Sequence, residues 1–333
     1  MRRHFSIIVI YWNSVQYIVK TLPKLLSLDG DIEYVLVDNG SVDGTLEYIK
    51  QCVKGNPRKN IKIIENKENK GISVAKNQGV KVSIGDYILL LDDDMYIENT
   101  NFLNNISSFY QTLDNPAFLM PLFLDKEELK DGYTASIGTY YYLFGIKKKI
   151  KKRNIKKVMK HSGPIEIAIN QGGAMYIKKD IWDDLGGFDE SQKFNLDDDD
   201  ISTRALVYGY KNYLYNKEYI VHMGFSKRQD KYRYAWNDLT YYSGKAKAIV
   251  KNFSFFTNLY MLPLFTLRAI AESIYHSFTL KYIKIFFATL VSIWRLFKDF
   301  PDTIKKRKKI QLHRKRSDKY ILKLKIPDYE SKG

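Results

Sequence analysis

Residues 87–91, with the sequence Tyr-Ile-Leu-Leu-Leu, run directly into three carboxylates, Asp92, Asp93 and Asp94. An apolar run of this kind is typical of a strand that is buried on both faces. Ligands of open α/β sheets bind beyond the carboxyl ends of the strands, and hard oxygen ligands suit Mg²⁺ or Mn²⁺ bound together with phosphates. Three adjacent carboxylates repel one another unless a cation compensates them. A solvated acidic turn is the alternative interpretation.

Strand-like and helix-like segments alternate four times before residue 95. The expected strands span 5–10, 34–37, 61–64 and 87–91, and the expected helices span 15–26, 46–52 and 73–82. This alternation predicts an α/β fold, Rossmann-like, with a mostly parallel sheet flanked by crossover helices. The later part of the chain is less regular. There we expect strands at 117–120, 172–177 and 219–222 and helices at 179–185 and 201–208.

The positive charge is concentrated in two segments. Residues 146–160 hold nine Lys or Arg and no acidic residue, and residues 301–333 hold twelve Lys or Arg against four acidic residues. These segments account for the whole net charge of +17. A uniformly basic protein would suggest nucleic-acid binding, and this charge distribution differs from that pattern. A neutral body with two basic segments indicates docking to some other anionic partner. We expect residues 140–160 to form a mobile insertion.

The composition favours a cytosolic compartment. Cys52 is the single cysteine, so no internal disulfide can form. The first apolar run, residues 5–10, is too short for a signal peptide and lacks its cleavage site, so we expect an unprocessed chain.

Residues 253–300 are rich in aromatic and aliphatic residues. Charged residues interrupt them too often for a spanning helix: Arg268, Glu272, Lys281, Lys284 and Arg295. Together with the basic segment that follows, they favour helices that lie in the headgroup layer of an anionic membrane. A helical hairpin packed on the body or on a second subunit is the alternative. We expect a domain at 1–225, in halves 1–98 and 99–225, and a C-terminal region at 226–333.

Polar and aromatic residues follow other predicted strands. Trp12 offers a flat face on which a nucleobase can stack, although a lone Trp is more often part of a core. Asp38 or Asn39 can accept a hydrogen bond from a base N–H group, although a lone Asp38 is more often a helix cap or turn residue. His222 can be a third metal ligand after Asp92 and Asp94, or a structural histidine.

A second acidic cluster, Asp197 to Asp200, lies at a predicted helix N-terminus. Carboxylates in a first helical turn are favoured by the helix dipole and need no other function. Four in a row exceed what capping requires, so one of them can be the base that takes a proton from an attacking hydroxyl. Arg204, one turn further on, is spaced to pair with Asp200.

Six motifs occur in the order found in one enzyme family. They are residues 7–13, Val37-Asp38-Asn39-Gly40-Ser41, the stretch from Asn69-x-Gly71 to Lys76-Asn77-x-Gly79, Leu90-Leu91-Asp92-Asp93-Asp94, Gly186-Gly187-Phe188-Asp189-Glu190, and Asp197-Asp198-Asp199-Asp200 with Arg204. Over residues 5–225 they resemble glycosyltransferase family 2. The resemblance implies a GT-A fold, a nucleoside-diphosphate-sugar donor, Mg²⁺ or Mn²⁺, and inversion at the anomeric carbon by single displacement.

The resemblance also implies roles on the donor side. Trp12 matches the aromatic residue, usually Tyr, that stacks on the base, and Asp38 and Asn39 match the pair that contacts base and ribose. Asp92 and Asp94 match the ends of the metal-binding Asp-x-Asp motif. The other expected donor-binding residues are Gly71, Lys76 in place of the usual arginine, Asn77, and Asp93.

On the acceptor side, Asp197 and Asp198 match the first two positions of the family's Glu-Asp-x-Asp pattern. The second position is the usual catalytic base, which makes Asp198 the expected base. Four consecutive aspartates leave this register ambiguous by one. The Val-x-His element at His222, with the aromatic and basic segments after it, is similar to rhamnosyltransferase-like members that act on membrane-linked glycans.

We therefore expect an inverting glycosyltransferase on the cytoplasmic face of a membrane. It would transfer a sugar from a UDP- or dTDP-sugar to a hydroxyl of a lipid-linked or cell-surface glycan, with no nucleic-acid partner. A sugar-phosphate nucleotidyltransferase is one alternative, but residues 11–14, Tyr-Trp-Asn-Ser, are not the Gly-rich basic loop that it needs. A non-catalytic membrane-surface scaffold with vestigial acidic sites is the other alternative.

Overall fold

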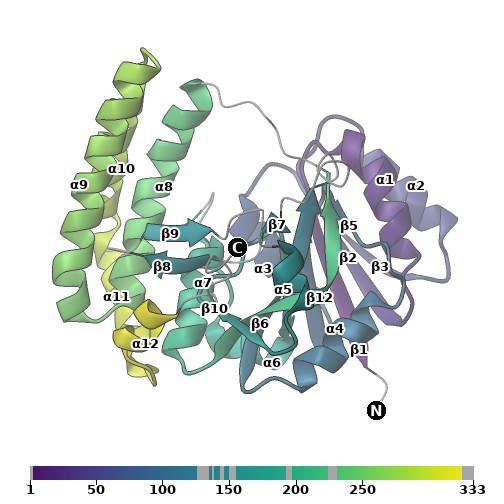
Figure 1. Ribbon diagram of the computed structural model, residues 1–333. Coiled ribbons are helices and arrows are strands. Elements are labelled where there is room, and N and C mark those ends of the chain that lie inside the picture. Colours follow the sequence, from purple (N-terminus) through teal and green to yellow (C-terminus); the bar gives the residue numbers. More distant parts are fainter. Residues whose placement is uncertain are drawn as a thin grey trace.

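A ten-stranded, mostly parallel sheet forms the centre of the part of the chain that the computed structural model describes (Figure 1). The described residues are 3–125, 135–136, 139–142, 146–149, 155–192, 197–223 and 231–324. The main path of the sheet has the order β10-β12-β6-β11-β4-β1-β2-β3, with β5 paired to β12 and β7 paired to β6.

The N-terminal half confirms the predicted alternation of strands and helices. Strands β1 (His4–Tyr11), β2 (Asp31–Asn39), β3 (Asn60–Asn66) and β4 (Tyr87–Asp92) are parallel, with β1 between β2 and β4. The crossover helices are α1 (Val15–Leu26), α2 (Thr45–Gly55) and α3 (Ile72–Val82). The carboxyl ends of these strands therefore meet at one edge of the sheet, where the sequence predicted a site.

The second half completes the sheet with mixed polarity. After β5 (Met95–Tyr96) and α4 (Phe102–Gln111) come β6 (Pro116–Asp125), β10 (Ile165–Ile167), β11 (Ala174–Lys178) and β12 (Lys211–His222). Strand β11 lies antiparallel between β4 and β6, and β12 is parallel to β6. Helices α6 (Lys179–Leu185) and α7 (Asp197–Val207) lie between the last two strands in the chain. Strand β12 is much longer than the expected residues 219–222, because its first half pairs with β6 and β10.

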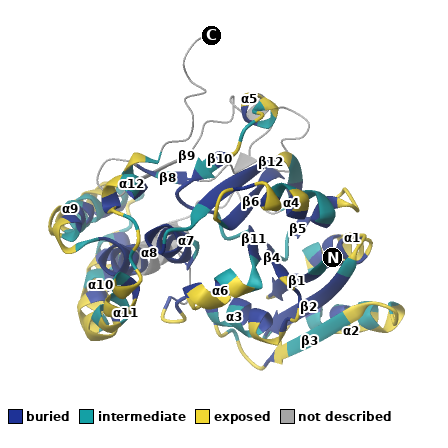
Figure 2. Cartoon of the chain, turned by 90° about the horizontal axis from the view of Figure 1, so that it is seen from below, coloured by how far each residue is buried: buried dark blue, intermediate teal, exposed yellow. Residues whose placement is uncertain are grey.

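Two hydrophobic clusters cover the two faces of the sheet. The central strands β1, β4 and β11 are accordingly coloured as buried in Figure 2. Alternate residues of β1 divide between the two clusters, as the two-residue period of a strand requires. Ile7 and Val9 pack with α1, α2 and α4, whereas Ile8 and Ile10 pack with α3, α6 and α7. The second cluster continues into the C-terminal helices, where it includes Phe253.

The structure describes residues 140–142, 146–149 and 155–160 of the predicted insertion, whose mobility stays a prediction. A small hairpin, β8 (Thr139–Tyr142) with β9 (Ile146–Lys149), is followed by the short helix α5 (Ile155–Lys160), while β7 (Ala135–Ser136) pairs with β6. Tyr141 is buried, packs edge-on against Phe253 and shares a 2.7 Å hydrogen bond with Thr203. Val158 is fully buried as well. Residues 143–145 and 150–154 of the predicted insertion lie outside the described residues.

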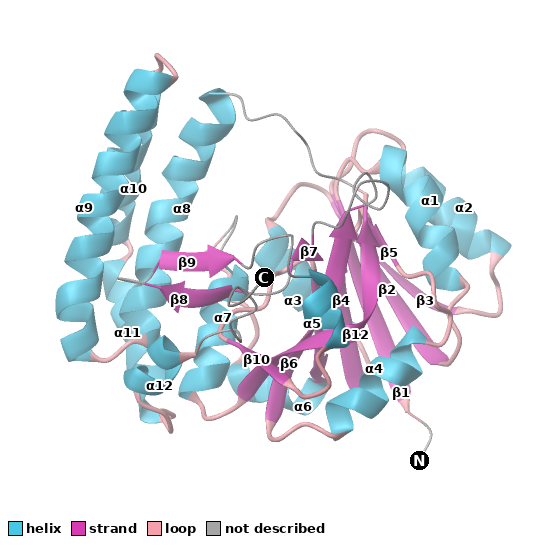
Figure 3. Ribbon diagram, in the orientation of Figure 1, coloured by secondary structure: helices cyan, strands magenta, loops and turns pink. Residues whose placement is uncertain are grey.

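The C-terminal region is helical, as predicted (Figure 3). It comprises α8 (Lys231–Asn252), α9 (Phe255–Thr279), α10 (Lys284–Lys298), α11 (Phe300–Leu312) and α12 (Asp318–Lys323). Throughout the described chain, each helix is too short or too polar to cross a bilayer. Helices α8 and α11 pack on α7, so the region adjoins the second half of the sheet domain. The division at residue 225 stays a prediction.

Candidate active site

A cavity of about 490 Å³ lies at the carboxyl ends of β1, β2 and β4. The sequence places small or polar residues at these ends, because the chain must turn there before each helix. Most of the predicted site residues line the cavity. The lining residues are Ile10, Trp12, Asn39, Asn69, Ile72, Lys76, Asp92, Asp93, Gly172, Gly173, Asp197 and Asp198.

Asp92 and Asp93 of the carboxylate triplet line one wall of the cavity, whereas Asp94 is not among the lining residues. Asp92 ends β4 and is partly exposed, and its neighbour Asp93 accepts a short hydrogen bond from the Ser14 hydroxyl. Burial, opposed by Lys76 and reinforced by Asp94, raises the pKa of Asp92. Burial likewise raises the pKa of Asp93 to about 7. These carboxylates are crowded, which is the condition under which a bound cation stabilises a site.

Asp94 and His222 are brought together at the end of two paired strands. The His222 Nε2 atom lies 3.1 Å from Asp94 Oδ2, because β5 and β12 pair antiparallel at this point. Within the described ranges, no cluster of three or more His, Cys, Asp or Glu side chains is arranged to hold a metal ion. The chemistry of the donors nevertheless fits Mg²⁺ or Mn²⁺, which prefer carboxylates and accept imidazole.

Lys76 connects the triplet to the opposite wall. Its side chain is buried, and its Nζ atom donates to the Gly172 carbonyl at 2.8 Å and lies 3.3 Å from Asp92 Oδ1. Burial alone would lower the pKa of Lys76, but the carboxylates of Asp92, Asp197 and Asp198 outweigh it and raise the pKa. Among the described residues of the cavity, Lys76 therefore places a fixed cation between several acidic groups.

The second acidic cluster forms the opposite wall. Helix α7 begins at Asp197, so all four aspartates occupy its first turn. Asp197 and Asp198 face the cavity, and Asp198 accepts a hydrogen bond from the Gly172 amide at 3.1 Å. Asp199 and Asp200 point away from it, to Lys245 at 2.8 Å and to Arg204 at 2.5 Å. The expected Asp200–Arg204 pair is thus present, but through one guanidinium nitrogen.

Of the residues expected to contact the nucleobase, Trp12 and Asn39 line the cavity and Asp38 does not. The Trp12 side chain is 53% exposed on the rim, which contradicts the alternative of a core aromatic. Asp38 is buried, and its Oδ2 atom accepts from the Gly40 and Ser41 amides in a tight turn. Its Oδ1 atom is also buried, and no hydrogen-bond partner for it occurs among the described residues. An orphaned buried acceptor of this kind suits a ligand N–H group.

Three predicted residues have structural contacts. Asn39 binds Asn66, Asn69 and the Lys70 amide, which docks the 66–71 loop on β2. Gly71 opens α3 with a φ of 89°, which favours glycine. Asn77 is outside the cavity lining.

The Asn77 side chain clamps the loop after α6. Its amide donates to the Phe188 carbonyl and to Glu190 Oε1, both at 3.0 Å, and accepts from the Phe188 amide. This loop carries the Gly186-to-Glu190 motif, so Asn77 connects a motif of the donor side to a motif of the acceptor side.

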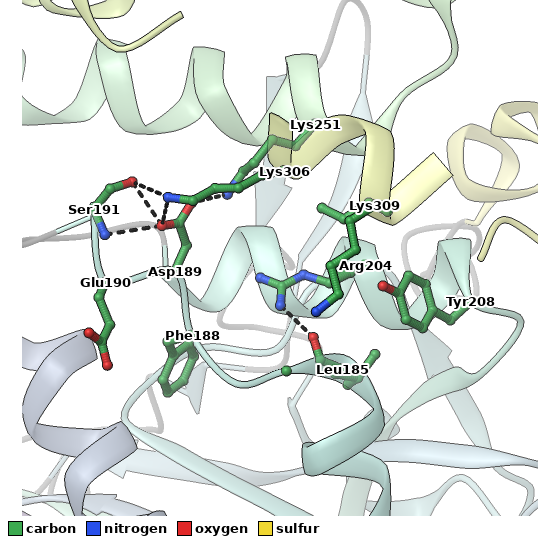
Figure 4. Close-up of a pocket in the computed structure, with 12 residues that line it drawn as sticks. Leu185, Phe188, Asp189, Glu190, Ser191, Arg204, Tyr208, Lys251, Lys306 and Lys309 are labelled. Atoms are coloured by element: carbon green, nitrogen blue, oxygen red, sulfur yellow. Dashed lines mark hydrogen bonds and ion pairs between the residues drawn. The ribbon is translucent and has the colours of Figure 1, made fainter. Parts of the chain in front are cut away.

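The sequence reasoning missed the contribution of the C-terminal helices. Lys251 of α8 and Lys306 of α11 both bind Asp189, at 2.5 and 2.7 Å (Figure 4). They line a second cavity, of about 280 Å³, with Arg204 and Lys309. Lysines set among small and apolar residues, Lys245, Lys247 and Lys251, were the signal that could have indicated buried ion pairs in this segment.

Comparison with known proteins identifies the sequence relationship. The sequence model of Glycosyl transferase family 2 matches residues 6–186. A Methanococcus voltae dolichyl N-acetyl-alpha-D-glucosaminyl phosphate 3-beta-D-2,3-diacetamido-2,3-dideoxy-beta-D-glucuronosyltransferase is 33% identical over 107 residues, 31% of this chain and 33% of that protein. Glycosyltransferase GlyG of Streptococcus pneumoniae is 29% identical over 112 residues, 33% of this chain and 35% of that protein. The matches thus span about a third of these relatives.

Solved structures show the same fold at low sequence identity. Staphylococcus aureus TarS 1-349 in complex with UDP-GlcNAc has a TM-score of 0.56 at 19% identity, covering 94% of this chain and 91% of that one. Mannosyltransferase PcManGT from Pyrobaculum calidifontis, in complex with GDP-Man and Mn²⁺, has a TM-score of 0.57 at 16% identity, covering 90% of this chain and 88% of that one. The GT-A fold implied by the resemblance is thereby confirmed.

Proposed function

Because the chain belongs to glycosyltransferase family 2, we propose that it transfers a sugar from a UDP- or dTDP-sugar to a hydroxyl of a lipid-linked or cell-surface glycan. One observation carries this proposal. A single cavity has Asp92 and Asp93 on one wall and Asp197 and Asp198 on the other, with a buried lysine between them and an exposed tryptophan on its rim.

We propose the following roles on the donor side. Trp12 stacks on the base, and the orphaned Oδ1 atom of Asp38 accepts a base N–H. Asp92 and Asp94, with His222, are the proposed ligands of Mg²⁺ or Mn²⁺, which when bound would neutralise the diphosphate. Lys76 supplies a fixed positive charge on the same side. Mn²⁺ is present in the solved mannosyltransferase with the same fold, which supports a divalent ion here.

Asp198 is the proposed general base. A sugar hydroxyl is a weak nucleophile at neutral pH, so a group must take its proton while the bond to the anomeric carbon forms and the diphosphate leaves. Asp198 lies on the wall opposite the triplet, and its partial exposure leaves it accessible to an acceptor. Attack from that side inverts the anomeric carbon.

Substitution of the two cavity-facing aspartates tests this assignment. Asp198→Asn should bind UDP with the affinity of the wild type. Its rate of sugar transfer from a UDP-sugar should be about 10²–10⁴-fold lower than that of the wild type. Asp197→Asn is the matched control and should lose much less turnover. If only Asp197→Asn is inactive, the base is the neighbour; if both variants stay active, the cluster is a helix cap and the mechanism is wrong.

A panel of nucleotide sugars, assayed with and without EDTA, separates the alternative functions. A glycosyltransferase should release nucleoside diphosphate from one nucleotide sugar of the panel, and EDTA should stop this reaction. A nucleotidyltransferase would instead form pyrophosphate from a nucleoside triphosphate and a sugar phosphate. A scaffold would bind without turnover.

We also propose that the C-terminal helices associate with an anionic membrane on the cytoplasmic face. Large apolar side chains are exposed along α9 and α10: Phe255, Phe256, Leu259, Tyr260, Leu267, Ile274, Tyr275, Phe278, Phe287, Leu290, Val291, Trp294 and Phe297. Exposed cations lie among them, and Lys298 stacks over the Trp294 ring at 5.5 Å. This combination is typical of an interfacial helix. A surface for a second subunit is the alternative.

Vesicle binding tests the membrane proposal. Removing residues 301–333 would disturb the fold, because Ile310 and Ile321 are buried in the core, so exposed side chains are the better target. The double variant Trp294→Ser/Phe297→Ser should lose binding to phosphatidylglycerol vesicles. The control variant Trp12→Ser should bind these vesicles like the wild type. Binding should weaken in high salt or on phosphatidylcholine. Unchanged binding of the double variant, or self-association through this face, would contradict the proposal.

A further inference from the structure

Helix α8 carries three lysines that are almost fully buried. Lys245, Lys247 and Lys251 are 0%, 5% and 1% exposed. A lysine is rarely buried to this extent unless a carboxylate compensates its charge. Two of the three reach the acidic first turn of α7, where Lys245 lies 2.8 Å from Asp199 and Lys251 lies 2.9 Å from Asp200.

Further contacts hold the same turn from the α8 side. Asn252 donates to Asp200 Oδ1 at 2.7 Å, and Lys251 also bridges to Asp189 on the loop after α6. The Lys245 ammonium lies 4.7 Å from the centre of the Tyr141 ring, and that tyrosine's hydroxyl bonds Thr203 one turn along α7.

These anchors determine which aspartates face the cavity. Successive side chains of a helix project about 100° apart, so fixing two adjacent residues fixes the direction of the preceding one. With Asp199 and Asp200 held on α8, Asp198 is directed to the Gly172 amide on the cavity wall. A rotation of the turn would move all four side chains together.

We propose that Lys245 is a positioning residue of the transfer reaction. By binding Asp199, Lys245 fixes the first turn of α7 so that Asp198 faces the attacking hydroxyl, and it neutralises the negative charge next to that base. This inference rests on the proposed role of Asp198. It makes α8, which is outside the residues matched by the family model, a part of the active site.

The same helix offers a matched control. Lys247 is also buried, but it pairs at 2.5 Å with Asp299, at the start of α11 and away from α7. Lys247→Met removes a buried cation from the same helix without touching the acidic cluster. If buried lysines on α8 only stabilise the fold, Lys245→Met and Lys247→Met should have the same effect on turnover.

The experiment compares the steady-state release of nucleoside diphosphate from the UDP- or dTDP-sugar that the wild type uses. The affinity for that nucleoside diphosphate is measured by calorimetry. Lys245→Met should lower kcat about 10–100-fold with little change in donor KM, because the base is misplaced and the donor site is intact. Lys247→Met should keep kcat per folded molecule. The acid limb of the kcat–pH profile should move to higher pH in Lys245→Met, since the uncompensated Asp199 charge raises the pKa of Asp198.

A double variant keeps the test valid if Lys245→Met does not fold. Lys245→Met/Asp199→Leu removes both buried charges, a change that is often neutral for stability. Its acid limb should return to the wild-type position while kcat stays reduced. Wild-type kcat in the double variant, or equal kcat losses in Lys245→Met and Lys247→Met, would overturn the proposal.

Asp198→Asn separates this proposal from the one it rests on. If Asp198→Asn is inactive and Lys245→Met has normal kcat, the base assignment stands and the positioning role fails. If Asp198→Asn is active, the base assignment itself fails.

Discussion

Replacing Lys76 by methionine tests the electrostatics of the candidate site without an activity assay. Lys76 is 2% exposed, and its Nζ atom lies 3.3 Å from Asp92 Oδ1. At an effective dielectric constant of about 20, the attraction at this distance is about 5 kcal/mol. Both groups lose hydration in the folded state, and the Asp92 side chain is 37% exposed, so the net loss is smaller. We expect the free energy of unfolding to fall by about 2–3 kcal/mol.

The effect of Mn²⁺ distinguishes this site from an ordinary ion pair. In EDTA, Lys76→Met leaves the crowded carboxylates without their cation, and urea unfolding followed by circular dichroism should show the full loss. With saturating Mn²⁺, the ion should replace the missing charge and recover about 1 kcal/mol or more, because it binds only the folded chain.

The matched control lies at the other end of the sheet. Lys62 pairs at 2.6 Å with Glu33, whose side chain is fully buried, near the amino ends of β2 and β3. Lys62→Met should be destabilising in a similar way, but Mn²⁺ should not restore its stability. Equal losses for Lys76→Met in EDTA and in Mn²⁺ would refute the idea that a bound cation replaces the charge of Lys76. No loss in either condition would refute the electrostatic reasoning itself.

Two further variants test the scaffold of the site. Hydrogen bonds from Lys62, Ser6 and the Ile84 amide outweigh burial and hold the pKa of Glu33 below its ordinary value of 4.5. The stabilisation is therefore present above about pH 4.5 and is lost as the pH falls through the lowered value. Glu33→Gln should lose about 1–3 kcal/mol of unfolding free energy at pH 7, and chemical unfolding at several pH values should show the gap closing in acid. A pH-independent gap would contradict this assignment. Gly40 has a φ of +80°, and a Cβ there would meet the Glu68 backbone at 2.6 Å. Gly40→Ala should lower thermal stability and UDP affinity. The control Gly44→Ala, at φ +93° but in open space, should cost only about 1 kcal/mol of backbone strain, and equal effects of the two would exclude the clash.

The nucleotide-binding half of the fold could be predicted because its signals are local. Each strand of residues 5–91 is a short apolar run, each helix has its own spacing, and the turn residues follow directly. The Asp92-to-Asp94 triplet and Trp12 could be located at strand ends for the same reason. The position of β11 between β4 and β6 could not, because antiparallel insertion depends on pairings far apart in the sequence.

The register of the second acidic cluster was unreadable for a different physical reason. Four identical side chains carry no information about which of them faces the cavity. Their directions are decided by Lys245 and Lys251, which lie far along the chain on α8. For Asn77, the sequence motif predicted a specific role, in donor binding. In the structure its side-chain amide is instead hydrogen-bonded to the Phe188 backbone.

The pairing of β4 with β11 also has a consequence for how the chain is made. Strand β4 ends at Asp92, but its antiparallel neighbour spans Ala174–Lys178, so during synthesis β4 has an open edge until that later segment emerges. At about 5–20 residues per second, this interval lasts on the order of ten seconds. An apolar strand with an unpaired edge is a template for association with other chains. The carboxylates that follow β4 add charge beside that edge, so in the nascent chain they oppose aggregation before the candidate active-site cavity exists.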